Sequence, residues 1–400
     1  MIKSIPTDWK VENISDIVFF QEGPGVRKTQ FTENGVKLLN VGNINDNKIK
    51  LNATKIYISE EEAYGKYKHF LVDEGDLLIA CSGIVVSTFH KKISFITKED
   101  LPLCLNTSTM RFRTLDDKNL NINFFKFFLM TDLFRNQLQR LITGSAQLNF
   151  GPSHIKQMFI PIPPPPQQEK IAKILDISSA LIEKQKELLK KYDLFLKSKF
   201  IEMFGDPISN PMGWEVVKFA KLANIKTVSI AADKISNEIY IALNSIEKET
   251  GRLVKKYSPE EEEIKSNKYI FTQDMLLYGK LRPNLNKVLL PSFSGVCSTD
   301  ILPIEPISNI STKQYLAYYL RHSKTVELLS NSVSGANLPR VSPKILKDLK
   351  IHKIPIELQT KFASIVEKIE QIKEQEVQKL EHLETLHNSL VDKAFKGEIK

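Results

Sequence analysis

Apolar residues recur with heptad spacing along a stretch that follows the prolines at 163–166 and runs to Pro207. Roughly 35 residues carry no helix breaker, and at 1.5 Å per residue they would form a helix about 50 Å long. Ser178 and Gln185 interrupt the apolar stripe at a positions. The other a and d positions are occupied by Ile171, Ile174, Leu181, Leu188, Tyr192 and Phe195. Such a stripe on a lone helix requires a partner helix.

The same pattern returns 191 residues later, where Pro152, Gln168 and Phe204 are matched by Pro343, Gln359 and Phe395. The frame of the second copy is filled by Phe362, Ile365, Ile369, Ile372, Leu383, Leu386 and Leu390. This internal repeat predicts that the two long helices pair as an antiparallel coiled coil.

A polar residue also breaks the second stripe, since Glu376 stands where Gln185 stands in the first. Both lie near the middle of their helices, so an antiparallel pair should bring them together. Polar residues at a positions often fix the register of a coiled coil. The alternative is that both side chains turn toward solvent.

Short apolar runs alternate with Gly, Asn and Asp turns in the remaining parts of the chain. They predict strands at 36–41, 76–80, 93–97 and 108–113 and a helix over 124–141, whose phenylalanines we expect in the core. Strands at 240–243 and 274–279 and a helix over 315–329 repeat this plan. We therefore predict mixed α/β (α+β) domains in two pseudo-repeated copies, separated by the two helices. The expected segments are 1–150, 151–206 with the first long helix, 207–341, and 342–400 with the second.

Composition narrows the class of protein. The 400 residues carry a net charge of +9, which favours an anionic partner, most commonly nucleic acid. The alternative is a mildly basic soluble protein, and charge alone does not decide between the two. No run of 18 apolar residues and no apolar signal core occur, so we expect a cytoplasmic chain without a membrane partner. Cys81, Cys104 and Cys297 lack Cys-x-x-Cys spacing and are expected to be reduced and structural, with no metal site.

Catalytic motifs are missing from the sequence. Asn210-Pro211-Met212-Gly213 lacks the second proline and the aromatic residue of an adenine methyltransferase base pocket. No Gly-x-x-x-x-Gly-Lys-Ser/Thr loop for nucleotide phosphates is present. We therefore expect that the chain is not itself an enzyme.

Several segments together resemble the specificity subunit of type I restriction-modification systems. They are GVKLLNVGNI at 35–44, GDLLIA at 75–80, the Pro-x-x-x-Gln-Gln-Glu-x-Ile signature at 163–171, MFGD at 203–206 and YGKLRPNLNK at 278–287. The resemblance extends over essentially the whole chain. It implies two target-recognition domains that read the two halves of a split double-stranded DNA site, held apart by the conserved helices.

The resemblance also implies partners. Two methyltransferase subunits with S-adenosylmethionine would dock on the conserved regions, and restriction subunits using ATP and Mg could join them. Catalysis would belong to these partners, and no cofactor is expected in this chain. The competing interpretations are a coiled-coil scaffold that joins two protein-binding domains and a remnant of a fused methyltransferase-specificity enzyme.

Residues that contact DNA are expected in loops at strand ends, carrying Arg, Lys, Asn, Gln or Ser. Arg282 is the strongest candidate, because the guanidinium fork can donate two bonds to guanine. Asn43 and Asn244 end equivalent strands, and each could cap a turn instead. The candidates are Arg27, Lys28, Asn43, Ser82, Lys91, Lys92, Gln147, Asn149, Lys226, Asn244, Lys280, Arg282, Asn284, Lys287, Asn337 and Arg340.

Overall fold

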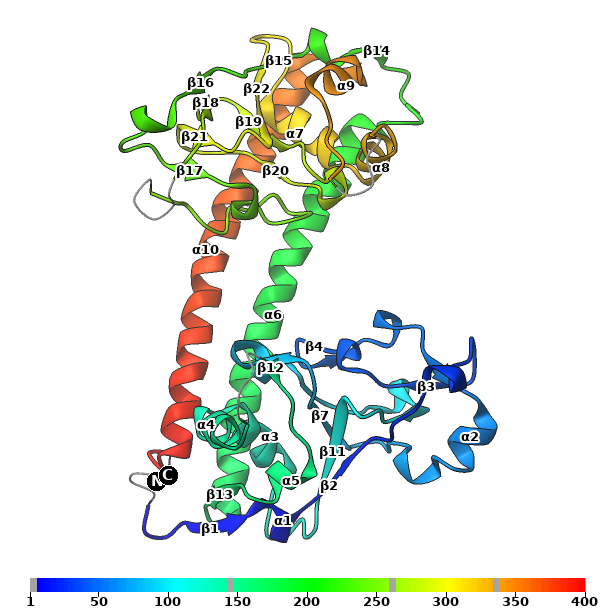
Figure 1. The fold of residues 1–400 in the computed structure, drawn as a ribbon. Coiled ribbons are helices and arrows are strands. Elements are labelled where there is room, and N and C mark those ends of the chain that lie inside the picture. The colour runs from blue at the N-terminus through cyan, green and yellow to red at the C-terminus, as the bar shows by residue number, and fades with distance from the viewer. Residues whose placement is uncertain (1–5, 143–146, 259–263, 334–337, 400) are drawn as a thin grey trace. The chain divides into compact units, whose positions relative to one another are not determined.

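The two proline-entered stretches form the long helices α6 (Pro165–Phe204) and α10 (Ile356–Phe395), each of 40 residues. The computed structural model describes residues 6–142, 147–258, 264–333 and 338–399 (Figure 1). The chain divides into unit 1, residues 1–183 with 381–400, and unit 2, residues 184–380. Each unit thus contains one globular part and a portion of both long helices, whereas the sequence suggested four consecutive segments.

The helices run antiparallel within each unit. In unit 1, Gln167 Nε2 donates to the Ile399 carbonyl at 2.7 Å, and Ser178 Oγ lies 2.7 Å from His387 Nδ1. In unit 2, Gln185 Nε2 donates to Glu376 Oε2 at 2.6 Å, and Lys373 Nζ lies 2.7 Å from Asp193 Oδ1. The meeting of Gln185 and Glu376 is the one that the antiparallel register predicts.

The buried stripe departs from the predicted heptad frame at four positions. Exposed fractions there are 46% for Leu181, 47% for Phe195, 38% for Ile372 and 53% for Leu386. The following residue faces inward instead at each place, namely Ile182, Leu196, Lys373 and His387. A straight α-helix drifts by about 20° per heptad, which explains the shift. Ile171, Phe362 and Glu376 are buried, and intermediate burial is found at Ile174, Gln185, Leu188, Tyr192, Ile365, Ile369, Leu383 and Leu390.

Unit 1 is built on a four-stranded sheet in the order β2 (Val18–Glu22), β11 (Thr109–Thr114), β7 (Leu77–Ala80) and β9 (Ile93–Phe95). A three-stranded sheet of β10 (Leu103–Cys104), β3 (Val36–Leu38) and β6 (Tyr57–Ile58) lies in the same unit, with α2 (Glu60–Tyr64). Three strand pairs complete it: β1 (Lys10–Asn13) with β13 (Phe159–Ile162), β4 (Ile44–Asn45) with β5 (Lys48–Ile49), and β8 (Ile84–Val85) with β12 (Gln147–Leu148).

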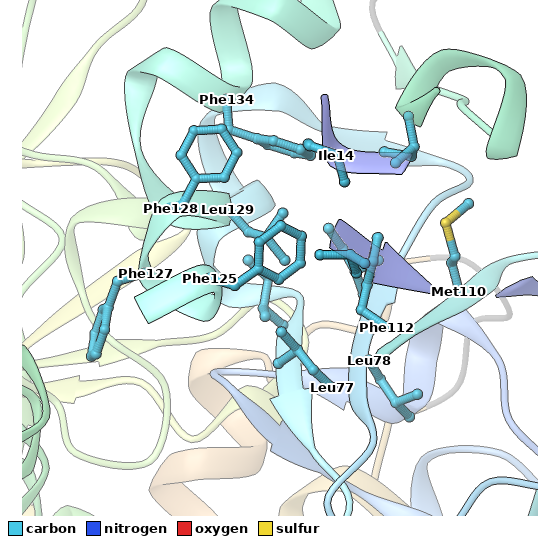
Figure 2. Close-up of a cluster of buried hydrophobic side chains, with 14 of the residues drawn as sticks. Ile14, Leu77, Leu78, Met110, Phe112, Phe125, Phe127, Phe128, Leu129 and Phe134 are labelled. Atoms are coloured by element: carbon cyan, nitrogen blue, oxygen red, sulfur yellow. The ribbon is translucent and has the colours of Figure 1, made fainter. Parts of the chain in front are cut away.

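The expected helix over 124–141 is two helices, α3 (Ile122–Met130) and α4 (Asp132–Leu141). Thr131 divides them, because its side chain accepts from the Phe134 amide and caps α4. Short helices α1 (Ile14–Ile17) and α5 (Pro152–Ile155) complete the unit. The aromatic side chains of α3 and α4 pack over β7 and β11 (Figure 2), which places this cluster in the core as predicted. The Phe124 ring also stacks on that of Phe395 of α10, with centroids 5.0 Å apart.

Unit 2 repeats the plan with the sheet β15 (Ala223–Ile225), β22 (Ile301–Pro306), β19 (Leu276–Gly279) and β20 (Val288–Leu289). A second sheet contains β16 (Ser229–Ile230), β18 (Lys268–Phe271), β21 (Gly295–Cys297) and β17 (Tyr240–Ile241). The strand β14 (Glu215–Lys218) pairs with β23 (Lys350–Lys353), just as β1 pairs with β13. The helices are α7 (Lys313–Arg321), α8 (Ser323–Asn331) and α9 (Pro343–Asp348), so the expected helix over 315–329 is also interrupted, at His322.

The repeat extends to individual hydrogen bonds at the start of each long helix. Gln168 is fully buried, and its Nε2 donates to the Asn119 and Pro163 carbonyls, both at 2.9 Å. Its Oε1 accepts from the Asn121 amide at 2.9 Å. Gln359 is equally buried and makes the same three bonds, to the carbonyls of Ile310 and Ile354 and the amide of Thr312. In each unit this side chain joins the long helix to the globular part that precedes it.

Other expectations concern single residue types. The three cysteines are buried and unbonded to one another, and burial raises the pKa of the Cys104 thiol to about 12. Among the residues that the structure describes, no helix is both long and apolar enough to cross a membrane.

Candidate nucleic-acid interface

Several of the candidate residues lie where the chain leaves the central strands β7 and β19. In unit 1 the Ala80 amide, at the end of β7, donates to the Lys92 carbonyl at 3.0 Å. In unit 2 the Gly279 amide, at the end of β19, donates to the Lys287 carbonyl at 2.8 Å. We call these two places the strand-end regions.

In each unit, a segment from much later in the sequence pairs with the strand-end region. β8 follows β7 and pairs with β12, with Gln147 opposite Val85. In unit 2, Leu281 follows β19 and bridges to Arg340. Loops far apart in the sequence therefore meet at one edge, as an interface made of strand-end loops requires.

A 3-10 turn borders each strand-end region, Val41–Asn43 (η2) in unit 1 and Leu243–Ser245 (η9) in unit 2. Asn43 is fully buried, and its Oδ1 accepts from the Asn40 amide at 2.9 Å. Asn43 is therefore a capping residue of the turn rather than an exposed DNA contact. Its counterpart is Ser245, whose Oγ accepts from the Ala242 amide at 3.1 Å.

The sequence pairing of Asn43 with Asn244 was thus off by one residue. Asn244 is exposed, and its Nδ2 donates to the Tyr257 hydroxyl at 3.2 Å.

The strand-end region of unit 1 contains a small polar group. Ser82 Oγ and the Gly83 amide both donate to Asn149 Oδ1, at 2.9 and 2.8 Å. Lys91 is exposed at the end of the 3-10 turn Val86–Lys91. Arg27 and Lys28 are exposed on a different turn, whose Gln30 side chain donates to Glu62 of α2.

In unit 2, Arg282 has a left-handed backbone with φ of 53° and an exposed side chain. The following Pro283 disfavours the right-handed helical conformation at Arg282. A bond from the Arg282 amide to the Pro339 carbonyl, 2.8 Å, holds this conformation in place. Asn284 is exposed on the adjoining 3-10 turn Pro283–Leu285. A non-glycine residue held with positive φ is a structural outlier of the kind that collects at functional sites.

Two of the predicted cations are engaged in ion pairs. Arg340 Nε lies 3.0 Å from Asp300 Oδ1, and Lys226 Nζ lies 2.9 Å from Glu305 Oε2. Lys280 is half-buried, and its amide donates to the Asp300 carbonyl at 2.9 Å. The predicted contact Asn337 lies outside the described residues.

Two lysines, one in each unit, make an equivalent bond to a main-chain carbonyl. Lys92 Nζ donates to the Val41 carbonyl at 3.3 Å and to Asn45 Oδ1 at 2.5 Å. Lys287 Nζ donates to the Leu243 carbonyl at 2.8 Å. Burial lowers the pKa of both ammonium groups.

The anchors of these side chains were missed in the sequence. Asp300, which holds Arg340, and Tyr257, which holds Asn244, carry no local signal of that role. Val41 and Leu243 contribute only carbonyl groups, whose direction depends on the fold and not on the residue type.

The comparisons with known proteins agree on one family. A profile for the type I restriction modification DNA specificity domain matches residues 6–191 and again residues 211–385. The EcoDI specificity subunit of Escherichia coli is 30% identical over 195 residues, which are 48% of this chain and 43% of that protein. The MjaIX specificity subunit of Methanocaldococcus jannaschii is 25% identical over 427 residues, 100% of this chain and 95% of that protein. The match to EcoDI therefore covers less than half of that relative.

Solved structures share the fold. A type I restriction-modification S subunit from M. genitalium has a TM-score of 0.55 and 16% identity, covering 99% of this chain and 97% of that one. A chain from a structure on complex assembly and conformational transition of the type I R-M system has a TM-score of 0.52 and 16% identity, covering 98% of both chains. At this identity the likeness shows the fold alone.

Proposed function

Because this chain belongs to the type I restriction modification DNA specificity family, we propose that it selects the DNA sequence on which methyltransferase subunits act. Each unit would read one element of a split site in double-stranded DNA. The observation that carries the proposal is the duplicated strand-end region, which has one backbone plan and two different sets of exposed side chains. Two readers of one design with different side chains fit a target of two different short elements with an unread gap.

We assign the chemistry to the partners. Two methyltransferase subunits would supply S-adenosylmethionine-dependent methylation, and a restriction subunit, where the system has one, would use ATP and Mg. This chain would act as a non-catalytic subunit in the cytoplasm. The specificity-domain description of its family supports this division of labour.

Within unit 2, we assign base reading to Arg282. It is exposed, and within the described part of the chain its guanidinium forms no ion pair, in contrast to Arg340 with Asp300. A free guanidinium fork can donate two parallel bonds to the O6 and N7 atoms of guanine. The fixed backbone at Arg282 reduces the freedom that such a contact would have to remove.

The test is to co-express the chain with its methyltransferase subunit and to map adenine methylation across a host genome. The expected result is one split motif with a fixed unread spacer. If the proteins copurify and no motif appears, the function as a specificity subunit is contradicted and the scaffold interpretation gains support.

A further inference from the structure

Lys92 and Lys287 occupy the same position in the two units, although the sequence repeat did not align them. The main-chain carbonyl of each lysine accepts from the last amide of the central strand, β7 or β19. The Nζ of each lysine donates to the carbonyl of the first residue in the neighbouring 3-10 turn, η2 or η9. We propose that these two lysines are a shared pair of DNA-backbone contacts, each donating from its strand-end region to a phosphate of its own half-site. This inference rests on the proposed function and specifies which candidate residues bind phosphate.

The positive charge at this position is not matched by an ion pair among the described residues. Neither lysine has a carboxylate within ion-pair distance among the described residues, and their partners are carbonyl and amide oxygens. Asp46 and Lys50 lie near Lys92 with opposite electrostatic effects on it, and they pair with one another at 3.2 Å. Partial burial of an ammonium without a counterion is unfavourable, so a bound anion would stabilise it.

Both ammonium groups keep a donor for such an anion. An ammonium group has three N–H donors. Lys287 uses one on Leu243, and Lys92 uses two, on Val41 and Asn45. Two donors of Lys287 and one donor of Lys92 therefore remain for a phosphate oxygen, and the bonds to the 3-10 turns can be kept.

Duplication indicates phosphate rather than base as the ligand. The two half-sites share the sugar-phosphate backbone, whereas their base sequences are expected to differ. The residues beside the lysines do differ, with half-buried Ser82 and exposed Asn149 in unit 1 and exposed Arg282 and Asn284 in unit 2. A residue that is the same in both units is suited to the component that both half-sites have in common.

The experiment measures how the affinity of the complex with its methyltransferase subunit for cognate duplex changes with salt. Lys92→Met and Lys287→Met are each expected to lower the slope of log K against log salt by about 0.9, and the double variant by roughly 1.8. Affinity for cognate and unrelated duplexes should fall by the same factor, because a phosphate contact carries no sequence information. Lys218→Met is the control and should keep the wild-type slope, because Lys218 lies on β14 and its Nζ is 2.7 Å from Asp348 Oδ1.

A second measurement first maps single phosphate contacts with the unaltered protein and then repeats the map with each Met variant. Single phosphates of the cognate duplex are replaced by neutral methylphosphonates, and we expect one position in each half-site where affinity falls and where the corresponding Met variant is insensitive. Unchanged salt slopes in both variants, or no such coupled position, would overturn the assignment. If the wild-type complex itself shows no salt-dependent DNA binding, the proposed function fails instead.

Discussion

Replacing Gln168 by Leu is expected to loosen the joint between α6 and the globular part of unit 1. The substitution keeps the side-chain volume but removes three hydrogen bonds and leaves the carbonyls of Asn119 and Pro163 and the amide of Asn121 without that partner. Each buried group left unsatisfied costs about 1–3 kcal/mol. Because some relaxation toward solvent will occur, we expect a loss of roughly 3–5 kcal/mol in the free energy of unfolding of unit 1.

The same change at Gln359 should cost unit 2 a similar amount, within about 1 kcal/mol, because it removes the same three kinds of bond. In both units the side chain binds two main-chain carbonyls and one amide, at 2.8 to 3.0 Å. Gln167→Leu is the matched control, because its side chain makes one bond, to the Ile399 carbonyl, and its removal should cost about 1 kcal/mol.

The assay is native-state hydrogen exchange followed by mass spectrometry, since it resolves the opening free energy of each unit separately. Urea unfolding of a chain with two units need not be two-state and would combine them. A loss below about 1 kcal/mol at Gln168, no larger than the control, would refute the reasoning that these bonds hold the joint. So would a large loss at one glutamine and none at the other.

Three further predictions concern recognition, pH and register. Arg282→Ala should lower the discrimination between bases at one position of one half-site by about 1–3 kcal/mol. The melting temperature should stay nearly unchanged because the side chain is exposed. A methylation motif unaltered at every position would contradict this prediction. Burial lowers the pKa of His387, so at acidic pH the unfolded chain binds more protons than the folded one. The stability that comes from keeping this imidazole neutral is complete above the unfolded pKa of about 6.5 and should be lost as pH falls below that value. His387→Leu should therefore unfold with a weaker pH dependence than the wild type between pH 7.5 and 5.5, and equal pH profiles would count against this. Replacing both Gln185 and Glu376 by Leu should permit shifted helix registers, detectable by cysteine cross-linking across the pair, and an unchanged cross-linking pattern would remove the role of this pair in register.

Periodic features could be predicted from the sequence, and contacts that depend on three-dimensional proximity could not. The helices α6 and α10 followed from their proline entry and from a repeat that spans them. The predicted heptad positions were wrong at Leu181 and Phe195, which are exposed. The prediction assumed a strict seven-residue repeat, whereas the buried stripe of these helices follows a period closer to 3.6 residues. Thr131 is a capping residue and could have indicated the break between α3 and α4, but the apolar spacing on both sides of it predicted one continuous helix.

At the candidate site, the sequence indicated the strand ends but not the use of each residue. Asn43 and Arg340 were as polar as Arg282 in the sequence, yet one is a buried cap and the other is paired with Asp300. The equivalence of Lys92 and Lys287 was not visible, since it depends on two carbonyl groups brought close by sheet pairing.

The glutamine joint also bears on how such a chain can change its specificity over generations. Gln168 binds only main-chain atoms, and the residues that supply them already differ between the units: Asn119, Asn121 and Pro163 correspond to Ile310, Thr312 and Ile354. Mutations at those positions can therefore accumulate without weakening the attachment of the helix. A foreign globular part that presents two carbonyls and one amide at this place could be grafted onto the same helix. Under the proposed function, new target sequences could then be acquired by exchange as well as by point mutation.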